Sequence, residues 1–238
     1  MDKKARKGTA WLFTPLWLVV ILAMLVLSLR FTINNRGYFL KTYLSMEIER
    51  EIGISAEDSA NAIMAMIDYM EGQREDIQLE VAEHGQSVDM FNQKEIDHMV
   101  DVRNLYQAFC YVEYAGLAIL AVLFIMLFLA RKKRPDISRA ITGGLWRALV
   151  VFACLLAVLG AYAIIDFYDF WTRFHYVFFT NDLWLMNYNT DRMIRICPLE
   201  LFSGIIARFT VIGLCALALV GVCAAQLCGR RRNKAKRA

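Results

Sequence analysis

The chain has 238 residues, of which 58% are hydrophobic, 13% aromatic and 21% charged, and its mean hydropathy is +0.39. Because a soluble domain averages about 45–50% apolar and about 25% charged residues, this composition excludes a collagen, a disordered tail and a disulfide-stapled mini-protein. The net charge of +4 gives no reason to expect nucleic-acid binding, because the basic residues gather between long apolar runs, where they set topology and contact anionic lipids.

Four apolar runs are long enough to cross a bilayer, since about 20 such residues span its hydrocarbon core as a helix. They are residues 11–29, 108–130, 145–165 and 205–227. The first run follows a basic start, as in a signal peptide. It exceeds the usual apolar core of about 7–15 residues, however, and no Ala-x-Ala cleavage site follows. We therefore interpret it as an uncleaved anchor, and the sequence predicts an all-α integral membrane protein with four transmembrane helices.

Lys and Arg predict the orientation of these helices. Most of the 27 basic residues fall in or next to three short segments on one side of the predicted membrane. The positive-inside rule places that side in the cytoplasm, so both termini are predicted to be cytoplasmic. The division that follows is a basic N-terminus (1–10), a basic cytoplasmic loop (131–144), a basic tail (228–238), and two extracellular segments (30–107 and 166–204).

The first extracellular segment is long and acidic, and it is predicted to form a mainly helical cap. Ser55 and Asp58 have capping-box spacing, apolar residues then recur at helical intervals, and Gly72 ends the run. Apolar and polar residues alternate over 77–81, which predicts a short strand, and Gly85 marks a turn.

A second cap helix is predicted from Gln93 into the second apolar run, because Asn92 and Glu95 have capping spacing. On this helix, His98 and Asp101 are three residues apart and share a face. A carboxylate in this position bonds one imidazole nitrogen, fixes the tautomer and raises the basicity of the other nitrogen. We therefore predict that Asp101 orients His98. The alternative is a surface helix with solvated charges.

The second extracellular segment is dense in aromatic and polar residues. Aromatic residues commonly form a belt at the membrane interface, which gives one interpretation of this segment. An interfacial anchor has no need of a histidine, asparagines and an aspartate within so short a stretch, and buried polar side chains need partners. The segment is therefore a candidate site. Its candidate residues are Phe174, His175, Phe178, Phe179, Asn181, Trp184, Asn187 and Asp191.

Two charged residues enter the apolar runs from the same outer side. Glu113 lies near one end of the second run, and Arg208 near the start of the fourth. Charges inside a membrane are costly and usually paired, so we predict a structural ion pair between them; the alternative is that each snorkels to the interface. The six cysteines form no Cys-x-x-Cys pair, and the sequence leaves open whether Cys110 and Cys197 form a disulfide.

At these residues the sequence resembles the lipoprotein intramolecular transacylases (Lit), a family of four-span bacterial membrane proteins. The motifs that carry the resemblance are His98-Met-Val-Asp101-Val102 and Phe174-His175-x-x-Phe178-Phe179-x-Asn181-x-x-Trp184, which continues to Asp191 and Pro198. In one departure from the family pattern, Tyr188 stands where a proline follows the asparagine at 187.

The resemblance implies an acyltransferase of the bacterial plasma membrane, with its site on the extracellular side. It moves an acyl chain from the sn-2 glyceryl oxygen of a diacylglyceryl lipoprotein to the α-amine of the N-terminal cysteine, giving the lyso form. The resemblance also implies that the enzyme has this lipoprotein and membrane lipids as partners, and that it uses no cofactor and no metal. His98 and His175 are the implied catalytic pair at the junction of cap and membrane.

Histidine suits this chemistry, because an amine with a pKa of about 7.7–8.0 must lose a proton before it attacks an ester. Asn181 or another donor would help to stabilise the oxyanion, and the aromatic residues would shape a dry pocket for lipid chains. Which histidine is the base, which lipoproteins are used and the oligomeric state stay open.

Two other functions compete with this interpretation. His98, Asp101, His175 and Asp191 could hold a metal ion for lipid or peptide hydrolysis, although no His-Glu-x-x-His motif supports this. The chain could also be a non-enzymatic membrane scaffold whose histidines are structural.

Overall fold

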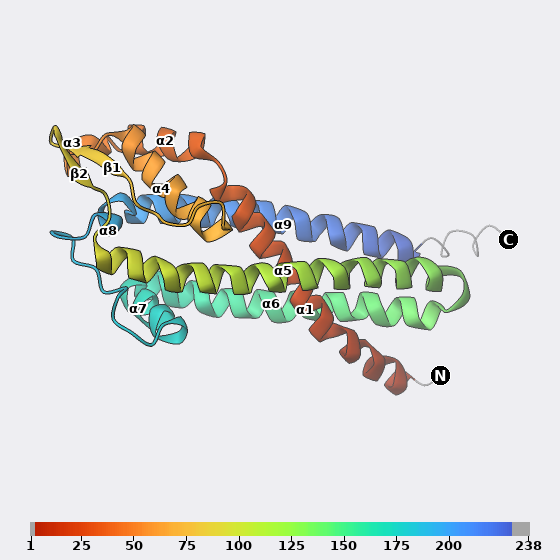
Figure 1. Ribbon diagram of the computed structural model, residues 1–238. Helices are drawn as coiled ribbons and strands as arrows, with labels where there is room; N and C mark the ends of the chain where they lie inside the picture. Colours follow the sequence, from red (N-terminus) through yellow and green to blue (C-terminus); the bar gives the residue numbers. More distant parts are fainter. Residues whose placement is uncertain (1–2, 230–238) are drawn as a thin grey trace. The chain divides into compact units, whose positions relative to one another are not determined.

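The structure is a computed structural model that describes residues 3–229 (Figure 1). The predicted basic tail (228–238) therefore lies almost wholly outside the described residues. In chain order the elements are α1 (Lys3–Ile33), α2 (Arg36–Ser45), α3 (Ile48–Ile52), α4 (Ala56–Glu71), β1 (Glu80–Glu83), β2 (Gln86–Asp89), α5 (Gln93–Lys133), α6 (Pro135–Ile165), α7 (Phe167–Phe178), α8 (Arg192–Ile196) and α9 (Leu199–Gly229).

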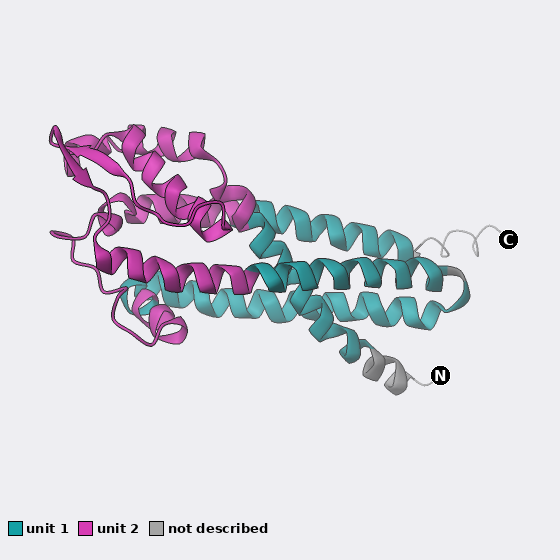
Figure 2. Ribbon diagram, in the orientation of Figure 1, with its two compact units in different colours: residues 1–28, 110–170, 210–238 teal, residues 29–109, 171–209 magenta. Residues whose placement is uncertain are grey.

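The chain divides into two compact units, each assembled from separate stretches of sequence (Figure 2). Unit 1 contains residues 1–28, 110–170 and 210–238, and unit 2 contains residues 29–109 and 171–209. The long helices α1, α5 and α9 each contribute residues to both units.

Four helices of the described chain are long and apolar enough to cross a membrane, as the sequence predicts. They cover Ala10–Ile33, Gln93–Arg131, Pro135–Ile165 and Leu199–Cys228. At about 1.5 Å per residue, the 41 residues of α5 extend well beyond the roughly 30 Å of a hydrocarbon core. The predicted span 108–130 is the later part of α5, so residues 93–107 form a helical extension before it. The predicted loop 131–144 is mostly helical, because only Arg134 separates α5 from α6.

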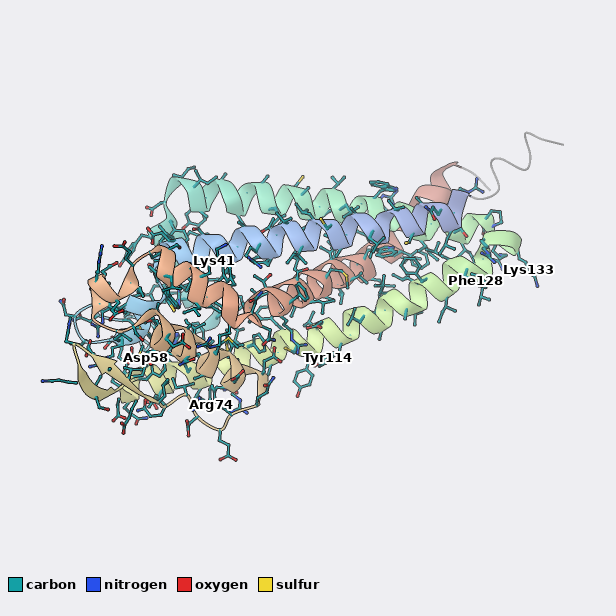
Figure 3. All side chains as sticks on the ribbon, turned by 90° about the horizontal axis from the view of Figure 1, so that it is seen from above. Lys41, Asp58, Arg74, Tyr114, Phe128 and Lys133 are labelled. Atoms are coloured by element: carbon teal, nitrogen blue, oxygen red, sulfur yellow. The ribbon has the colours of Figure 1, made fainter. Side chains whose placement is uncertain are left out.

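Unit 1 has a buried tryptophan in its interior and exposed apolar side chains on its surface. The Trp17 ring is fully buried, and its Nε1 donates to the Ile141 carbonyl of α6 at 2.9 Å. Tyr114 and Phe128 are exposed on α5, and Figure 3 shows Tyr114 projecting away from the helix. An exposed apolar surface on four long helices suits contact with lipid tails.

A glycine allows close approach of α1 and α5 in unit 1. A Cβ added at Gly116 would lie 2.3 Å from the Ala23 Cβ and 2.9 Å from the Val19 carbonyl oxygen. We expect Gly116→Ala to lower stability by about 1–3 kcal/mol through overpacking. Thermal unfolding in detergent measures the effect. Gly160→Ala is the control, because a Cβ there meets no atom within 4 Å; equal midpoints for the two variants would contradict the prediction.

In unit 2, capping residues set both ends of helix α4. Ser55 Oγ accepts from the Asp58 N–H at 3.0 Å, which begins α4, and Gly72 ends that helix in a left-handed conformation with φ +79°. Both ends agree with the sequence prediction. Helices α2 and α4 lie side by side, and polar side chains such as Asp58 and Arg74 cover this unit (Figure 3).

The strand prediction is wrong in its bounds. β1 pairs antiparallel with β2 from Glu80 to Glu83, whereas the alternation predicts residues 77–81. Ile77 is buried because it packs into unit 2, which gives an alternating pattern without a paired strand. The ladder begins only where β2 runs alongside. The predicted turn at Gly85 is confirmed, since His84 and Gly85 both have positive φ, as a two-residue hairpin requires.

Candidate functional site

All the predicted site residues except Glu113 belong to unit 2, and the beginning of α5 positions the first of them. The predicted capping box is confirmed: Glu95 Oε2 accepts from the Asn92 N–H at 2.7 Å, and Asn92 Oδ1 accepts from the Glu95 N–H at 3.1 Å. Glu95 Oε1 also accepts from the Met193 N–H of α8 at 2.5 Å. This fully buried carboxylate therefore fixes the first turn of α5, and His98 follows one turn later.

Substitution of Glu95 tests how much this carboxylate contributes to holding the first turn of α5. Glu95→Gln leaves one buried N–H without an acceptor, so we expect stability to fall by about 1–3 kcal/mol. Burial raises the pKa of Glu95. A raised folded pKa means that stability falls as pH rises through it, and the glutamine variant loses this slope. Thermal midpoints across pH measure both effects. Glu75→Gln, at an exposed residue, is the control; equal behaviour of the two variants would contradict the prediction.

Helix α7 positions His175. His175 Nδ1 lies 2.8 Å from the Trp171 carbonyl oxygen, one turn earlier. A carbonyl only accepts, so Nδ1 carries the proton and Nε2 of the neutral ring keeps its lone pair. Burial lowers the pKa of His175 below its ordinary value, and the bond to the Trp171 carbonyl opposes that shift.

The two histidines lie together within unit 2. Their ring centroids are 6.3 Å apart, and Phe179 contacts both, at 5.3 Å from His98 and 5.7 Å from His175. Trp184 stacks on His175 at 4.7 Å with 23° between the planes, and Trp171 meets it edge-on at 4.6 Å. Aromatic rings therefore surround an imidazole pair that the sequence places 77 positions apart.

His98 is nearly buried, and its Nδ1 has no hydrogen-bond partner among residues 3–229. Burial, followed by the charge of His175, lowers the pKa of His98 to about 4, against the opposing charge of Asp101. His98 is therefore a neutral imidazole near pH 7.

The predicted hydrogen bond between Asp101 and His98 is wrong. Asp101 Oδ2 instead accepts from Asn181 Nδ2 at 2.8 Å. The two residues share a face of α5, as predicted, but the carboxylate turns to the loop after α7, where an amide donor is available. Asp101 thus acts on His98 through its charge. Asn181 donates to this carboxylate, which differs from its predicted part as an oxyanion donor.

A cavity of about 310 Å³ lies beside the histidines. Five predicted residues line it: His98, Phe174, His175, Phe179 and Trp184. Every lining residue except the two histidines is aliphatic, aromatic or sulfur-containing. Several wall residues were not among the predicted site residues, including Met66, Met70, Leu105, Trp171 and Phe202. Trp171 was detectable from its aromatic segment. Met66 and Met70 lie on the apolar face of α4, which has the same pattern as a core-facing helix.

Four predicted binding residues do not line this cavity: Phe178, Asn181, Asn187 and Asp191. Phe178 is partly exposed and packs on Phe174, at 4.9 Å between centroids. Asp191 is buried within the loop, where its carboxylate accepts from Asn92 Nδ2 at 3.0 Å and from the Asn187 N–H at 2.8 Å. These bonds use Asp191 and Asn187 to hold the loop onto α5, so a polar cluster suited to a ligand is satisfied by the protein itself.

The remaining predicted side chains have these positions. The Arg208 guanidinium lies 4.3 Å from the centre of the Tyr38 ring, while Glu113 is a buried residue of unit 1, so their ion pair stays a prediction. No disulfide joins any of the cysteines within residues 3–229. No group of three possible metal ligands occurs in the described part of the chain.

Tyr188, the departure from the family pattern, has a partner. Its hydroxyl donates to Glu51 Oε1 of α3 at 2.8 Å. The hydrogen bond ties the loop to the cap, where a proline would restrict the backbone instead.

Comparisons with known proteins identify the family. The family model of the lipoprotein intramolecular transacylase Lit matches residues 14–202. Among solved structures, Lit from Bacillus cereus is similar with a TM-score of 0.73 and 17% identity, over 95% of this chain and 99% of that one. A variant of that protein with a histidine replaced by arginine has a TM-score of 0.69 and 17% identity, over 97% of each chain. No curated protein matches. The family match covers more than half of the sequence, and the chain therefore belongs to the lipoprotein intramolecular transacylase (Lit) family.

Proposed function

We propose that this chain transfers an acyl group within a diacylglyceryl lipoprotein. The acyl chain leaves the sn-2 glyceryl oxygen and joins the α-amine of the N-terminal cysteine, which gives a lyso-form lipoprotein. Membership of the Lit family supports the reaction class and the lipoprotein substrate. The observation that carries the proposal is the pair of neutral imidazoles beside an apolar cavity.

His175 is the general base in this proposal. The Trp171 carbonyl holds the proton on Nδ1, which leaves Nε2 to accept a proton from the attacking amine. The same carbonyl stabilises the imidazolium that forms. Since burial lowers the pKa of His175 below the usual value of about 6.5, the ring stays in its base form throughout the neutral range.

His98 is the neutral hydrogen-bond donor. An imidazole with a pKa of about 4 carries one N–H and no charge near pH 7, so it can donate to the oxygen that develops negative charge. Its Nδ1 has no hydrogen-bond partner within residues 3–229, whereas Nδ1 of His175 is held by the Trp171 carbonyl.

The reaction balances with these two groups. The amine nitrogen attacks the ester carbonyl, and His175 takes the N–H proton. The tetrahedral intermediate collapses, the bond from carbonyl carbon to glyceryl oxygen breaks, and the departing alkoxide takes back one proton. An amide and a free hydroxyl result. Both reacting groups belong to one molecule, so holding them close supplies much of the rate.

The apolar cavity wall supports a lipid substrate. We further propose that residues 30–107 and 166–204 face the extracellular side, that membrane lipids surround the four long helices, and that the site opens toward that outer side. The basic segments on the opposite side support this orientation.

Mass spectrometry of an intact lipoprotein tests the function. The chain is expressed in a bacterium that makes diacylglyceryl lipoproteins and lacks N-acylating enzymes, and the N-terminal lipopeptide is fragmented. A transacylase conserves the parent mass, while fragments show one acyl group moved to nitrogen. If a folded, membrane-inserted chain leaves the amine free, the proposal is wrong and the scaffold alternative takes its place.

A further inference from the structure

Asn181 makes two side-chain hydrogen bonds that fix its orientation. Its Nδ2 donates to Asp101 Oδ2 at 2.8 Å, and its Oδ1 accepts from the Leu183 N–H at 3.1 Å. The acceptor thus meets a backbone N–H while the donor meets a carboxylate, so the amide has one consistent orientation. This side chain joins the loop after α7 to α5, three residues beyond His98.

The backbone of the same residue supports the other histidine. The Asn181 carbonyl accepts from Trp184 Nε1 at 2.9 Å. The Trp184 ring is nearly buried and stacks on His175 at 4.7 Å. Asn181 is therefore bonded to a neighbour of each imidazole, Asp101 on one side and Trp184 on the other.

We propose that Asn181 is a positioning residue that sets the relative placement of His98 and His175, through its amide bond to Asp101 and its carbonyl bond to Trp184. The inference rests on the proposed function, because the pair it places is the acid–base pair of that reaction. Asn181 does not line the cavity, and so it acts through these two neighbours without touching the substrate.

The chemistry of an amide suits this position. A neutral donor holds the Asp101 carboxylate and leaves its charge in place, whereas a lysine or arginine would cancel that charge. The retained charge raises the pKa of His98 against the effects of burial, of His175 on α7 and of Lys94 on α5. Asp101 is thereby a positioning residue as well, acting on His98 through charge.

Asn181→Leu tests the amide bond. The variant keeps a side chain of similar size and loses both polar contacts, so the loop is free to shift relative to α5. We expect the rate of acyl transfer to fall by roughly 10²-fold, as for a displacement of about 1 Å in a catalytic site. The ratio of its rate to that of the wild type should not rise as pH falls.

Asn181→Asp gives a distinctive pH signature. Two carboxylates at hydrogen-bond distance cannot both ionise easily, so the pair shares a proton and one pKa rises. The protonated acid then donates to its neighbour as the amide did. We expect the rate relative to wild type to climb as pH falls from about 8 toward about 5. Asn189→Asp makes the same change at an exposed residue of the loop, and its ratio to wild type should stay near one.

A second measurement needs no substrate. In a His84→Asn background only His98 and His175 remain, and labelled imidazole signals report their titration. Asn181→Leu keeps the backbone carbonyl that accepts from Trp184, but it loses the side-chain bond that holds this loop to Asp101. Trp184 should then shift with the loop and cover His175 less, so the midpoint of His175 should rise toward about 6.5. Asn189→Asp should leave it in place.

These measurements distinguish a failure of the proposed function from a failure of the positioning role of Asn181. A wild-type chain that moves no acyl group contradicts the proposed function, and the histidine titration still decides the positioning role. An Asn181→Leu chain with wild-type rate and titration overturns the inference, as does an Asn181→Asp ratio that does not change with pH. If Asn181→Asp alone fails to fold, it is combined with Asp101→Asn, which restores an amide–carboxylate pair. Activity above that of Asp101→Asn alone supports the role, and activity no higher overturns it.

Discussion

Replacing His175 by asparagine is expected to lower the rate of acyl transfer by roughly 10²–10⁴-fold, the usual contribution of a positioned general base. Asparagine places an amide nitrogen near the position of the imidazole Nδ1, so it retains a donor for the Trp171 carbonyl. It has no counterpart of Nε2. The variant therefore removes the proton acceptor while keeping the bond that holds this turn of α7.

The fragmentation pattern of the N-terminal lipopeptide measures this loss, with His84→Asn as the control. His84 is exposed in the hairpin turn with φ +50°, a conformation that asparagine tolerates well. This control should transfer the acyl group at the wild-type rate. Unchanged transfer by a folded His175→Asn chain would exclude His175 as the base.

Replacing His98 by phenylalanine is expected to lower the rate by roughly 10²–10³-fold, as for the loss of one oxyanion donor. Phenylalanine keeps a ring against Phe179, where the imidazole now packs edge-on. It also removes a buried Nδ1 that has no hydrogen-bond partner in the described chain. Because an unsatisfied buried polar atom costs stability, the thermal midpoint should stay level or rise.

Loss of activity with gained stability is a signature that a structural histidine would not give. Thermal unfolding in detergent and the lipopeptide assay are run on one preparation, with His84→Asn again as the control. A fall in both activity and midpoint would assign His98 a packing role and support the scaffold interpretation.

Features set by neighbouring residues were predictable from the sequence. The capping boxes at Ser55 and Asn92 involve residues three apart, so their spacing identifies them without knowledge of the fold. The four apolar runs are equally local, because length and hydropathy alone identify a helix able to cross a membrane. The family motifs identified both histidines, and the structure shows that they lie close together.

The choice of hydrogen-bond partners was not predictable, because it depends on contacts between distant residues. The spacing of His98 and Asp101 predicts a shared face, but the donor that captures the carboxylate is Asn181, 80 positions away. Asp191 lies in a segment whose composition is typical of a ligand site, yet its carboxylate accepts a hydrogen bond from Asn92, 99 positions away. A polar side chain has the same sequence signal whether its partner is a substrate or the protein.

The apolar wall of the cavity bears on the fidelity of the reaction. Water competes with the amine for the ester carbonyl. Attack by water would hydrolyse the ester and release a free fatty acid in place of the N-acylated product. Around His98 and His175 the wall presents aliphatic, aromatic and sulfur-containing side chains, which give a water molecule few hydrogen bonds. Substitutions that add polar groups to this wall, such as Met66→Gln, would favour hydrolysis over transfer. The choice between an N-acylated product and a hydrolysed one thus depends on residues that take no part in moving protons.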